Sequence, residues 1–210
     1  MEKFVYRAVN PRSDADMLKL ANLERSLQAF CNSEKQITKE HLKWSRIHMG
    51  AVEYFDDYKG KELLPLEENA DEFVYVCEAG DEFVGYVEVC SYHVVDGKRP
   101  DDDIGILHEI YVKDEYRGGE IAYRLLQMGI DKLLQKNKTR AICNVQEDNP
   151  NRHLHFAMAG KNVIDQKEIK RCNGKKTIDY TLLIDLNNLK KKSMVQLARD
   201  SAKIRREMGK

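Results

Sequence analysis

The sequence predicts a mixed α/β fold in one domain, because strand-like segments pair first as a hairpin and later alternate with helices. Two apolar runs, residues 73–77 and 83–90, lie on either side of a Gly80-Asp81 turn and predict the hairpin. The length of 210 residues agrees with one domain, since a typical domain holds roughly 100 to 200 residues.

Four segments are expected before the hairpin. In chain order they are a strand, a helix, a second helix and a long loop: residues 4–9, 13–30, 38–49 and 56–69. Ser13 and Thr38 supply a capping hydroxyl at the start of the two helical patterns. The loop segment is rich in charge and lacks a sustained apolar period, which is typical of a long connection over a site.

Strand-like and helical patterns alternate after the hairpin. They predict a strand, a helix, a strand, a short helix and a last strand: residues 104–112, 119–136, 141–145, 153–160 and 177–184. The long helix at 119–136 has one broad apolar face, so we expect it to pack against the sheet.

The composition argues against a nucleic-acid partner and a membrane protein. The chain has 35 Lys or Arg residues and 35 Asp or Glu residues, and phosphate binding normally shows as an excess of positive charge. No apolar run reaches the ~18 residues that span a bilayer, and residues 1–7 lead into no signal-peptide core. We therefore expect a cytoplasmic protein without a membrane partner.

The five cysteines predict neither a disulfide framework nor a metal site. Their number is odd, and no two of them have the spacing of metal ligands. Cys77, Cys90 and Cys143 lie inside apolar strand-like runs, where a free thiol behaves as a small hydrophobic group. We expect reduced thiols and no bound metal.

The C-terminal residues differ in composition from the rest. Residues 186–210 hold eight basic and two acidic residues, with apolar residues at helical spacing, so we divide the chain into a domain at 1–185 and a basic amphipathic helical tail. An isolated helix of this length is marginal in water. We expect the tail to bury its apolar stripe against the chain's own core or a second copy in a homodimer, ahead of nucleic acid.

The strand-turn-helix at residues 110–122 is the most informative stretch. Gly118 and Gly119 stand at a helix start, where exposed backbone N–H groups at the positive end of the helix dipole form a site for a pyrophosphate. Arg117 could add a charged donor. An ordinary strand-to-helix turn is the alternative interpretation.

This stretch resembles the acetyl-CoA signature of the GNAT N-acetyltransferases, Arg/Gln-x-x-Gly-x-Gly/Ala. Arg117 takes its first position and Ala122 its last, while Glu120 replaces the central glycine. Further along, Asn149 matches the family's asparagine, and Phe156 stands where the family has a tyrosine. The order of the predicted elements is also similar to that of the family.

The resemblance implies a mixed, mainly antiparallel sheet that is splayed between two central parallel strands and flanked by helices. The parallel strands would be residues 106–112 and 141–145, which part to admit the pantetheine arm of acetyl-CoA, the expected cosubstrate. The resemblance assigns eleven residues to cosubstrate binding: Ile110, Tyr111, Val112, Arg117, Gly118, Gly119, Glu120, Ile121, Ala122, Asn149 and Phe156.

Acetyl transfer to an amine needs a base, because an alkylammonium has a pKa near ~10.4. His108 is the first candidate, since similar enzymes place a histidine or glutamate at this position of the strand. Glu109 is the second candidate, because strand alternation points it to the other face unless a bulge intervenes. A histidine satisfied within the sheet is the alternative for His108.

Phe156 has no proton to give to the leaving thiolate. Solvent, His153, His155 or Tyr180 could substitute, or catalysis could be lost. The resemblance therefore implies an acetyl-CoA-dependent N-acetyltransferase that acts on a primary amine of a small molecule or peptide by direct attack. A non-catalytic acyl-CoA-binding regulatory module is the alternative. An acidic loop at residues 96–103 would attract a cationic amine, or is simply solvated.

Overall fold

The structure is a computed structural model that describes residues 3–30, 49, 70–91, 102–170 and 174–209. The predicted helix at 38–49, except Met49, and the predicted loop at 56–69 lie outside the described residues, as does most of the acidic loop. Two compact units divide the chain: residues 1–92 with 109–129, and residues 93–108 with 130–210. Each unit is described by itself.

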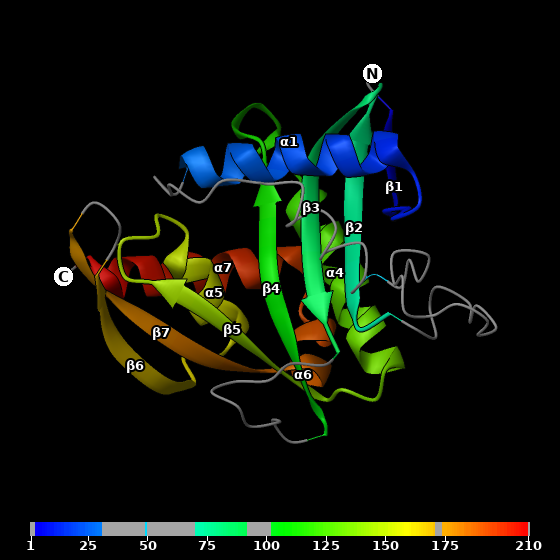
Figure 1. Cartoon of the computed structure of the whole chain (residues 1–210). Coiled ribbons are helices and arrows are strands. Elements are labelled where there is room, and N and C mark those ends of the chain that lie inside the picture. The colour runs from blue at the N-terminus through cyan, green and yellow to red at the C-terminus, as the bar shows by residue number, and fades with distance from the viewer. Residues whose placement is uncertain (1–2, 31–48, 50–69, 92–101, 171–173, 210) are drawn as a thin grey trace. The chain divides into compact units, whose positions relative to one another are not determined.

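The strands follow the order β1-β2-β3-β4-β5-β7-β6 (Figure 1). Their bounds are Phe4–Ala8, Glu72–Ala79, Glu82–Cys90, Ile104–Val112, Arg140–Gln146, Val163–Lys170 and Lys176–Asp185 for β1 to β7. The β4–β5 ladder is parallel, whereas those of β1–β2, β2–β3, β5–β7 and β6–β7 are antiparallel. The predicted fold class, a mixed and mainly antiparallel sheet flanked by helices, is confirmed.

Five α-helices and a short 3-10 helix occur in the described residues. They are α1 Asp14–Phe30, η3 Asp114–Tyr116, α4 Ile121–Gln135, α5 Arg152–Met158, α6 Leu186–Lys191 and α7 Met194–Met208. Gly80, with a φ of 58°, turns the predicted hairpin between β2 and β3. None of the described helices has the length and hydropathy needed to cross a membrane.

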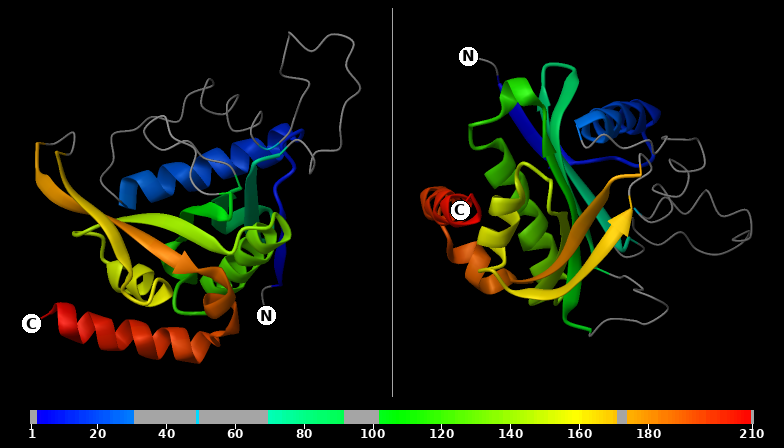
Figure 2. Two further views of the ribbon diagram at one scale, coloured as in Figure 1. Left: turned by 90° about the horizontal axis from the view of Figure 1, so that it is seen from below. Right: turned by 90° about the vertical axis from the view of Figure 1, so that its left-hand side faces the viewer.

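In the first unit, α1 and α4 lie on opposite faces of β2 and β3 (Figures 1 and 2). The hydroxyl of Ser13 caps α1 by accepting from the backbone N–H of Asp16 at 3.2 Å, as the sequence predicts. Arg7 of β1 binds both carboxylate oxygens of Asp16, at 2.6 and 2.9 Å, and this bond holds the pKa of Asp16 below its ordinary value. The start of α1 is thereby tied to the edge strand.

Apolar side chains of α1 and the strands form the core of the first unit. They are Val9, Met17, Leu20, Leu23, Met49, Val74, Val76, Phe83, Tyr86 and Tyr111, all less than a tenth exposed. Tyr86 is fully buried in this cluster although it has a hydroxyl, so that hydroxyl needs a partner.

In the second unit, the parallel ladder between β4 and β5 is short. It pairs Ile104–Ile106 with Arg140–Ile142, although β5 continues to Gln146 and pairs there with β7 alone. Asp103 holds the start of this ladder, because its carboxylate accepts from the Arg140 guanidinium at 2.7 and 2.9 Å. The helix α5 lies between the sheet of this unit and α7 (Figure 2).

The sequence interpretation missed the strand β6 between α5 and the predicted last strand. Most residues of β6 are exposed, and it pairs only with β7 among the described strands. An edge strand of this kind has no buried face, so its sequence shows no apolar alternation for a pattern to detect. The C-terminal residues also form two helices, because the chain extends at Lys192 and Ser193 caps α7.

Gly85 of β3 lies where a side chain would collide with β4 and α4. A Cβ there would approach the Tyr111 carbonyl oxygen and Val112 Cγ2 to 3.1 Å and Leu125 Cδ1 to 3.2 Å. We therefore expect Gly85→Val to lower the free energy of unfolding by about 1–3 kcal/mol, measured by urea denaturation. An unchanged midpoint would contradict this close packing within the first unit.

Candidate functional site

The connection from β4 to α4 is a tight, exposed turn in the first unit. The backbone N–H of Tyr116 donates to Lys113 at 2.9 Å and that of Arg117 donates to Asp114 at 3.2 Å, which closes the 3-10 helix. Gly118 follows with a φ of 86°, in the left-handed region that favours glycine. The chain then enters α4 at Ile121.

Five consecutive backbone N–H groups at this turn donate to no oxygen in the described residues. They belong to Gly118, Gly119, Glu120, Ile121 and Ala122. The first N–H groups of an α-helix lack intrahelical partners and lie at the positive end of its dipole. A run of such groups at an exposed helix start can bind the oxygens of a phosphate or pyrophosphate. The structure thus brings together the predicted pyrophosphate residues.

Arg117 stabilises this turn through contacts with Val112, Asp114 and Tyr111. Its Nε donates to the Val112 carbonyl at 2.8 Å, and its guanidinium pairs with Asp114 at 2.7 Å and lies 5.4 Å from the centre of the Tyr111 ring. These contacts tie the turn to the end of β4. Burial raises the pKa of the Tyr111 hydroxyl, and the Arg117 charge opposes that rise.

Glu120, which replaces a glycine of the family signature, forms an ion pair with Arg124 one helical turn later, at 2.8 Å. Its carboxylate is about half exposed, so the pair is weak and screened by salt. Arg124 nevertheless offsets the negative charge that Glu120 places at the helix start. The guanidinium of Arg124 also lies 5.3 Å from the centre of the Tyr6 ring.

The two candidate bases differ in their surroundings. His108 is exposed and belongs to the second unit, whereas Glu109 is half-buried and belongs to the first. The buried Tyr86 hydroxyl of β3 donates a hydrogen bond to Glu109 Oε2. Burial, followed by the Glu109 charge, raises the pKa of Tyr86 well above its ordinary value, so Tyr86 stays a donor at neutral pH. Ile110 beside Glu109 is half-buried, and Tyr111 and Val112 are buried.

An acidic cluster on β2 and β3 was not expected from the sequence. Glu72 lies directly opposite Cys90, and Glu88 shares their face two residues earlier on β3. The carboxylate and thiol atoms of these three residues lie within 4.8 Å of one another. Both glutamates are less than a tenth exposed. A charged residue inside an otherwise apolar strand, Glu88 at 83–90, is the one sequence signal that could have indicated the cluster.

The surroundings of Glu72 and Cys90 shift the pKa values of these two residues. Burial raises the pKa of Glu72 to about 9, helped by the charge of Glu88 and, more weakly, of Glu109. Burial also raises the pKa of the Cys90 thiol. Glu72 therefore keeps its proton at neutral pH.

The predicted residues of the second unit lie at the turn from β5 to α5. Asn149 Oδ1 accepts from the Asn151 backbone N–H at 2.8 Å and thus shapes that turn. Phe156 is buried in α5, and its ring meets the Tyr180 ring edge-on with 5.4 Å between centres. His153 and His155 are half-buried, and burial lowers the pKa of both imidazoles.

Comparison with known proteins identifies similar sequences and folds. The sequence model described as the acetyltransferase (GNAT) family matches residues 37–158, more than half of the chain. A search of curated proteins found no match.

Solved structures share the fold at low sequence identity. YncA of Salmonella typhimurium, described as a putative acetyltransferase with its cofactor acetyl-CoA, has a TM-score of 0.59 and 16% identity over 87% of this chain and 94% of its own. Smu.2055 of Streptococcus mutans has a TM-score of 0.61 and 13% identity over 87% and 99%. A GNAT-family acetyltransferase of Streptococcus pneumoniae has a TM-score of 0.58 and 14% identity over 86% and 98%.

We expect Glu72→Gln to stabilise the protein at alkaline pH. Folded Glu72 holds its proton to about pH 9, whereas the unfolded carboxyl loses it near ~4.3. Between these values the folded state binds more protons, so the wild-type protein loses stability as the pH rises. Glutamine removes this dependence and should add on the order of 1–3 kcal/mol at about pH 8.

Urea unfolding at about pH 5 and pH 8 measures this effect. The exposed Glu115→Gln is the control and should leave the pH dependence of the wild type unchanged. Equal pH dependence in the wild type and Glu72→Gln would show that Glu72 titrates normally in the folded protein.

Proposed function

The chain belongs to the acetyltransferase (GNAT) family, and we propose from this that it is an N-acetyltransferase acting on a primary amine of a small molecule or peptide. Acetyl-CoA is the proposed cosubstrate and supplies the acetyl thioester. The observation that carries the proposal is the run of five backbone N–H groups from Gly118 to Ala122, at the start of α4, that find no acceptor within the described part of the chain.

The chemistry of this turn fits a pyrophosphate. Its donors are backbone amides at a helix N-terminus, which favour an anion without the side-chain entropy that lysines would lose. Arg117 contacts the Val112 carbonyl and the Asp114 carboxylate, so we propose that it mainly stabilises the conformation of the turn that presents the amides. The pantetheine arm would then run along β4 at Ile110 and Val112, as the resemblance to the family implies.

The proposed reaction is direct attack of the neutral amine on the thioester carbonyl. A C–N bond forms, the carbon–sulfur bond breaks through a tetrahedral intermediate, and the electron pair leaves on the thiolate. A backbone N–H near the carbonyl oxygen would stabilise the negative charge that develops there. The amine nitrogen must lose one proton before attack and a second from the intermediate, and the thiolate takes up one.

His108 is the proposed proton acceptor, because it is exposed and a histidine titrates near neutral pH. Glu109 is the second candidate, because the Tyr86 hydroxyl donates to its Oε2 and fixes the carboxylate on β4.

The thiolate needs a proton donor other than Phe156. Tyr180 is our candidate, because its ring packs against Phe156 and places a phenol beside that position. Solvent is the alternative donor. Phe156 also favours a second function, that of a non-catalytic acyl-CoA-binding regulatory module, which would bind the cosubstrate without turnover. We further propose that the protein is cytoplasmic and has no nucleic-acid or membrane partner.

Gly118→Val should weaken acetyl-CoA binding at least about tenfold, because valine cannot keep the φ of 86° that aligns the N–H groups. Calorimetric titration of acetyl-CoA measures the change. Gly174→Val is the matched control, since Gly174 also has a positive φ, of 80°, in the turn between β6 and β7. The control should lose similar stability and keep wild-type affinity. Equal affinity in both variants would remove the turn from the binding site.

The pH dependence of acetylation separates the two candidate bases. With His108 as base, the rate falls below the imidazole pKa, so His108→Gln should lose this acidic limb and most of the rate. Glu109→Gln should keep the limb. The measurement is kcat/KM from about pH 5 to 9 for both variants. A limb retained in His108→Gln and lost in Glu109→Gln would assign the base to Glu109.

A further inference from the structure

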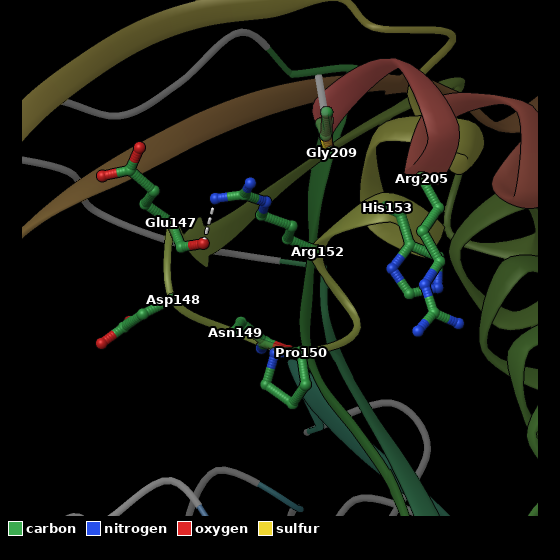
Figure 3. Close-up of a pocket in the computed structure, with 9 residues that line it drawn as sticks. Glu147, Asp148, Asn149, Pro150, Arg152, His153, Arg205 and Gly209 are labelled. Carbon is green, nitrogen blue, oxygen red and sulfur yellow. Dashed lines mark hydrogen bonds between the residues drawn. The ribbon is translucent and has the colours of Figure 1, made fainter.

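A pocket of about 380 Å³ lies in the second unit between the turn that follows β5 and the C-terminal end of α7 (Figure 3). This volume is in the range of small-molecule sites. Three of its lining side chains have N–H donors and are basic or titratable: Arg152, His153 and Arg205. Pro150 and Met208 add apolar surface.

Arg205 gives the pocket a guanidinium that no described residue neutralises. In the described part of the chain, its side chain forms no hydrogen bond or ion pair. Figure 3 shows it beside His153 at the edge of the pocket. All five guanidinium donors of Arg205 are therefore available.

Arg152 adds a second positive charge to the pocket, and His153 adds an imidazole. Arg152 donates one Nη1 hydrogen bond to the Glu147 carbonyl, which holds its side chain across the pocket and leaves further donors (Figure 3). Burial lowers the pKa of His153, and the charges of Arg205 and Arg152 lower it further. The charges of both guanidinium groups thus lower the pKa of the same imidazole, that of His153.

The acidic residues of the pocket leave this charge in place. Asp148 is engaged by Lys175 at 3.3 Å and by the Thr177 hydroxyl at 3.4 Å, both outside the lining. The carboxylates of Glu147 and Asp148 point away from Arg205 and His153 in Figure 3. On α7, the neighbouring Glu207 pairs with Lys161 instead.

We propose that this pocket binds a phosphate monoester attached to an apolar or aromatic body, with Arg205, Arg152 and His153 holding the phosphate. Guanidinium groups match phosphate oxygens in charge and geometry. The pocket is larger than a bare phosphate needs, and Pro150 and Met208 offer contacts for a body of nucleoside size. The ligand we propose is nucleotide-like and separate from the cosubstrate. The proposal does not depend on acetyl transfer.

Adenosine 3′,5′-bisphosphate and inorganic phosphate are the probes, added to the full-length protein. Calorimetry should show that the bisphosphate binds. Arg205→Gln should weaken this binding at least about tenfold, because it removes a charged hydrogen bond between the guanidinium and the phosphate. Arg206→Gln is the matched control, because Arg206 lies on the same helix and is exposed outside the pocket. It should bind like the wild type. Inorganic phosphate should compete with the bisphosphate.

A second readout does not depend on calorimetry. A bound anion beside His153 should raise the pKa of its imidazole. NMR titration with and without the bisphosphate measures this pKa. The rise should vanish in Arg205→Gln. No binding at millimolar probe, or equal affinity in Arg205→Gln and Arg206→Gln, would overturn the proposal.

Coenzyme A and 3′-dephospho-coenzyme A distinguish a separate ligand from the cosubstrate. If Arg205→Gln weakens binding of coenzyme A but not of 3′-dephospho-coenzyme A, the pocket is part of the cosubstrate site and the proposal of a separate ligand is wrong. If it weakens only the bisphosphate, the pocket serves a separate ligand. Arg205 lies outside the turn at Gly118. The affinity of Gly118→Val for acetyl-CoA therefore tests the proposed function separately, and a failure of the present proposal would not change that test.

Discussion

The proposed function depends on five neighbouring backbone N–H groups, Gly118 to Ala122, that have no acceptor among the described residues. A helix start leaves such donors by necessity, and they are tolerated here because the turn is exposed. Gly118 begins this run with a positive φ, and the bonds from Arg117 to Val112 and Asp114 tie the turn to the end of β4. The helix start that lacks its first hydrogen bonds is suited to an anion. Acetyl-CoA is the proposed cosubstrate for this turn, and the proposal is supported by membership of the acetyltransferase (GNAT) family.

The buried polar groups of the first unit are the second feature on which the proposed reaction depends. Tyr86 has its hydroxyl inside the core and donates a hydrogen bond from it to Glu109, which fixes a carboxylate on β4, the strand that leads to the turn at Gly118. Glu72 and Glu88 are buried side by side, and the proton retained by Glu72 reduces their repulsion. Burying acids lowers stability, and such costs are common where a site needs a defined charge.

The sequence predicted most elements, because strands with a buried face and amphipathic helices leave a periodic pattern. It missed β6, whose exposed residues have no such pattern. The turn at Gly118 was predicted from adjacent glycines before a helix. The sequence did not predict the pairing of Glu109 with Tyr86 or of Glu72 with Cys90, because cross-strand partners depend on strand register and on which face is buried. Arg117 was expected at a phosphate, and its bond to the Val112 carbonyl could not be inferred from spacing.

The central claim is that this chain moves an acetyl group from a thioester to an amine. The most direct measurement incubates the protein with acetyl-CoA carrying a labelled acetyl group and a panel of primary amines, and follows free thiol and labelled amide together. The account predicts that both products appear in equal amounts, only with protein and a suitable amine. Bound acetyl-CoA that stays intact with every amine, or thiol released without any labelled amide, would contradict it.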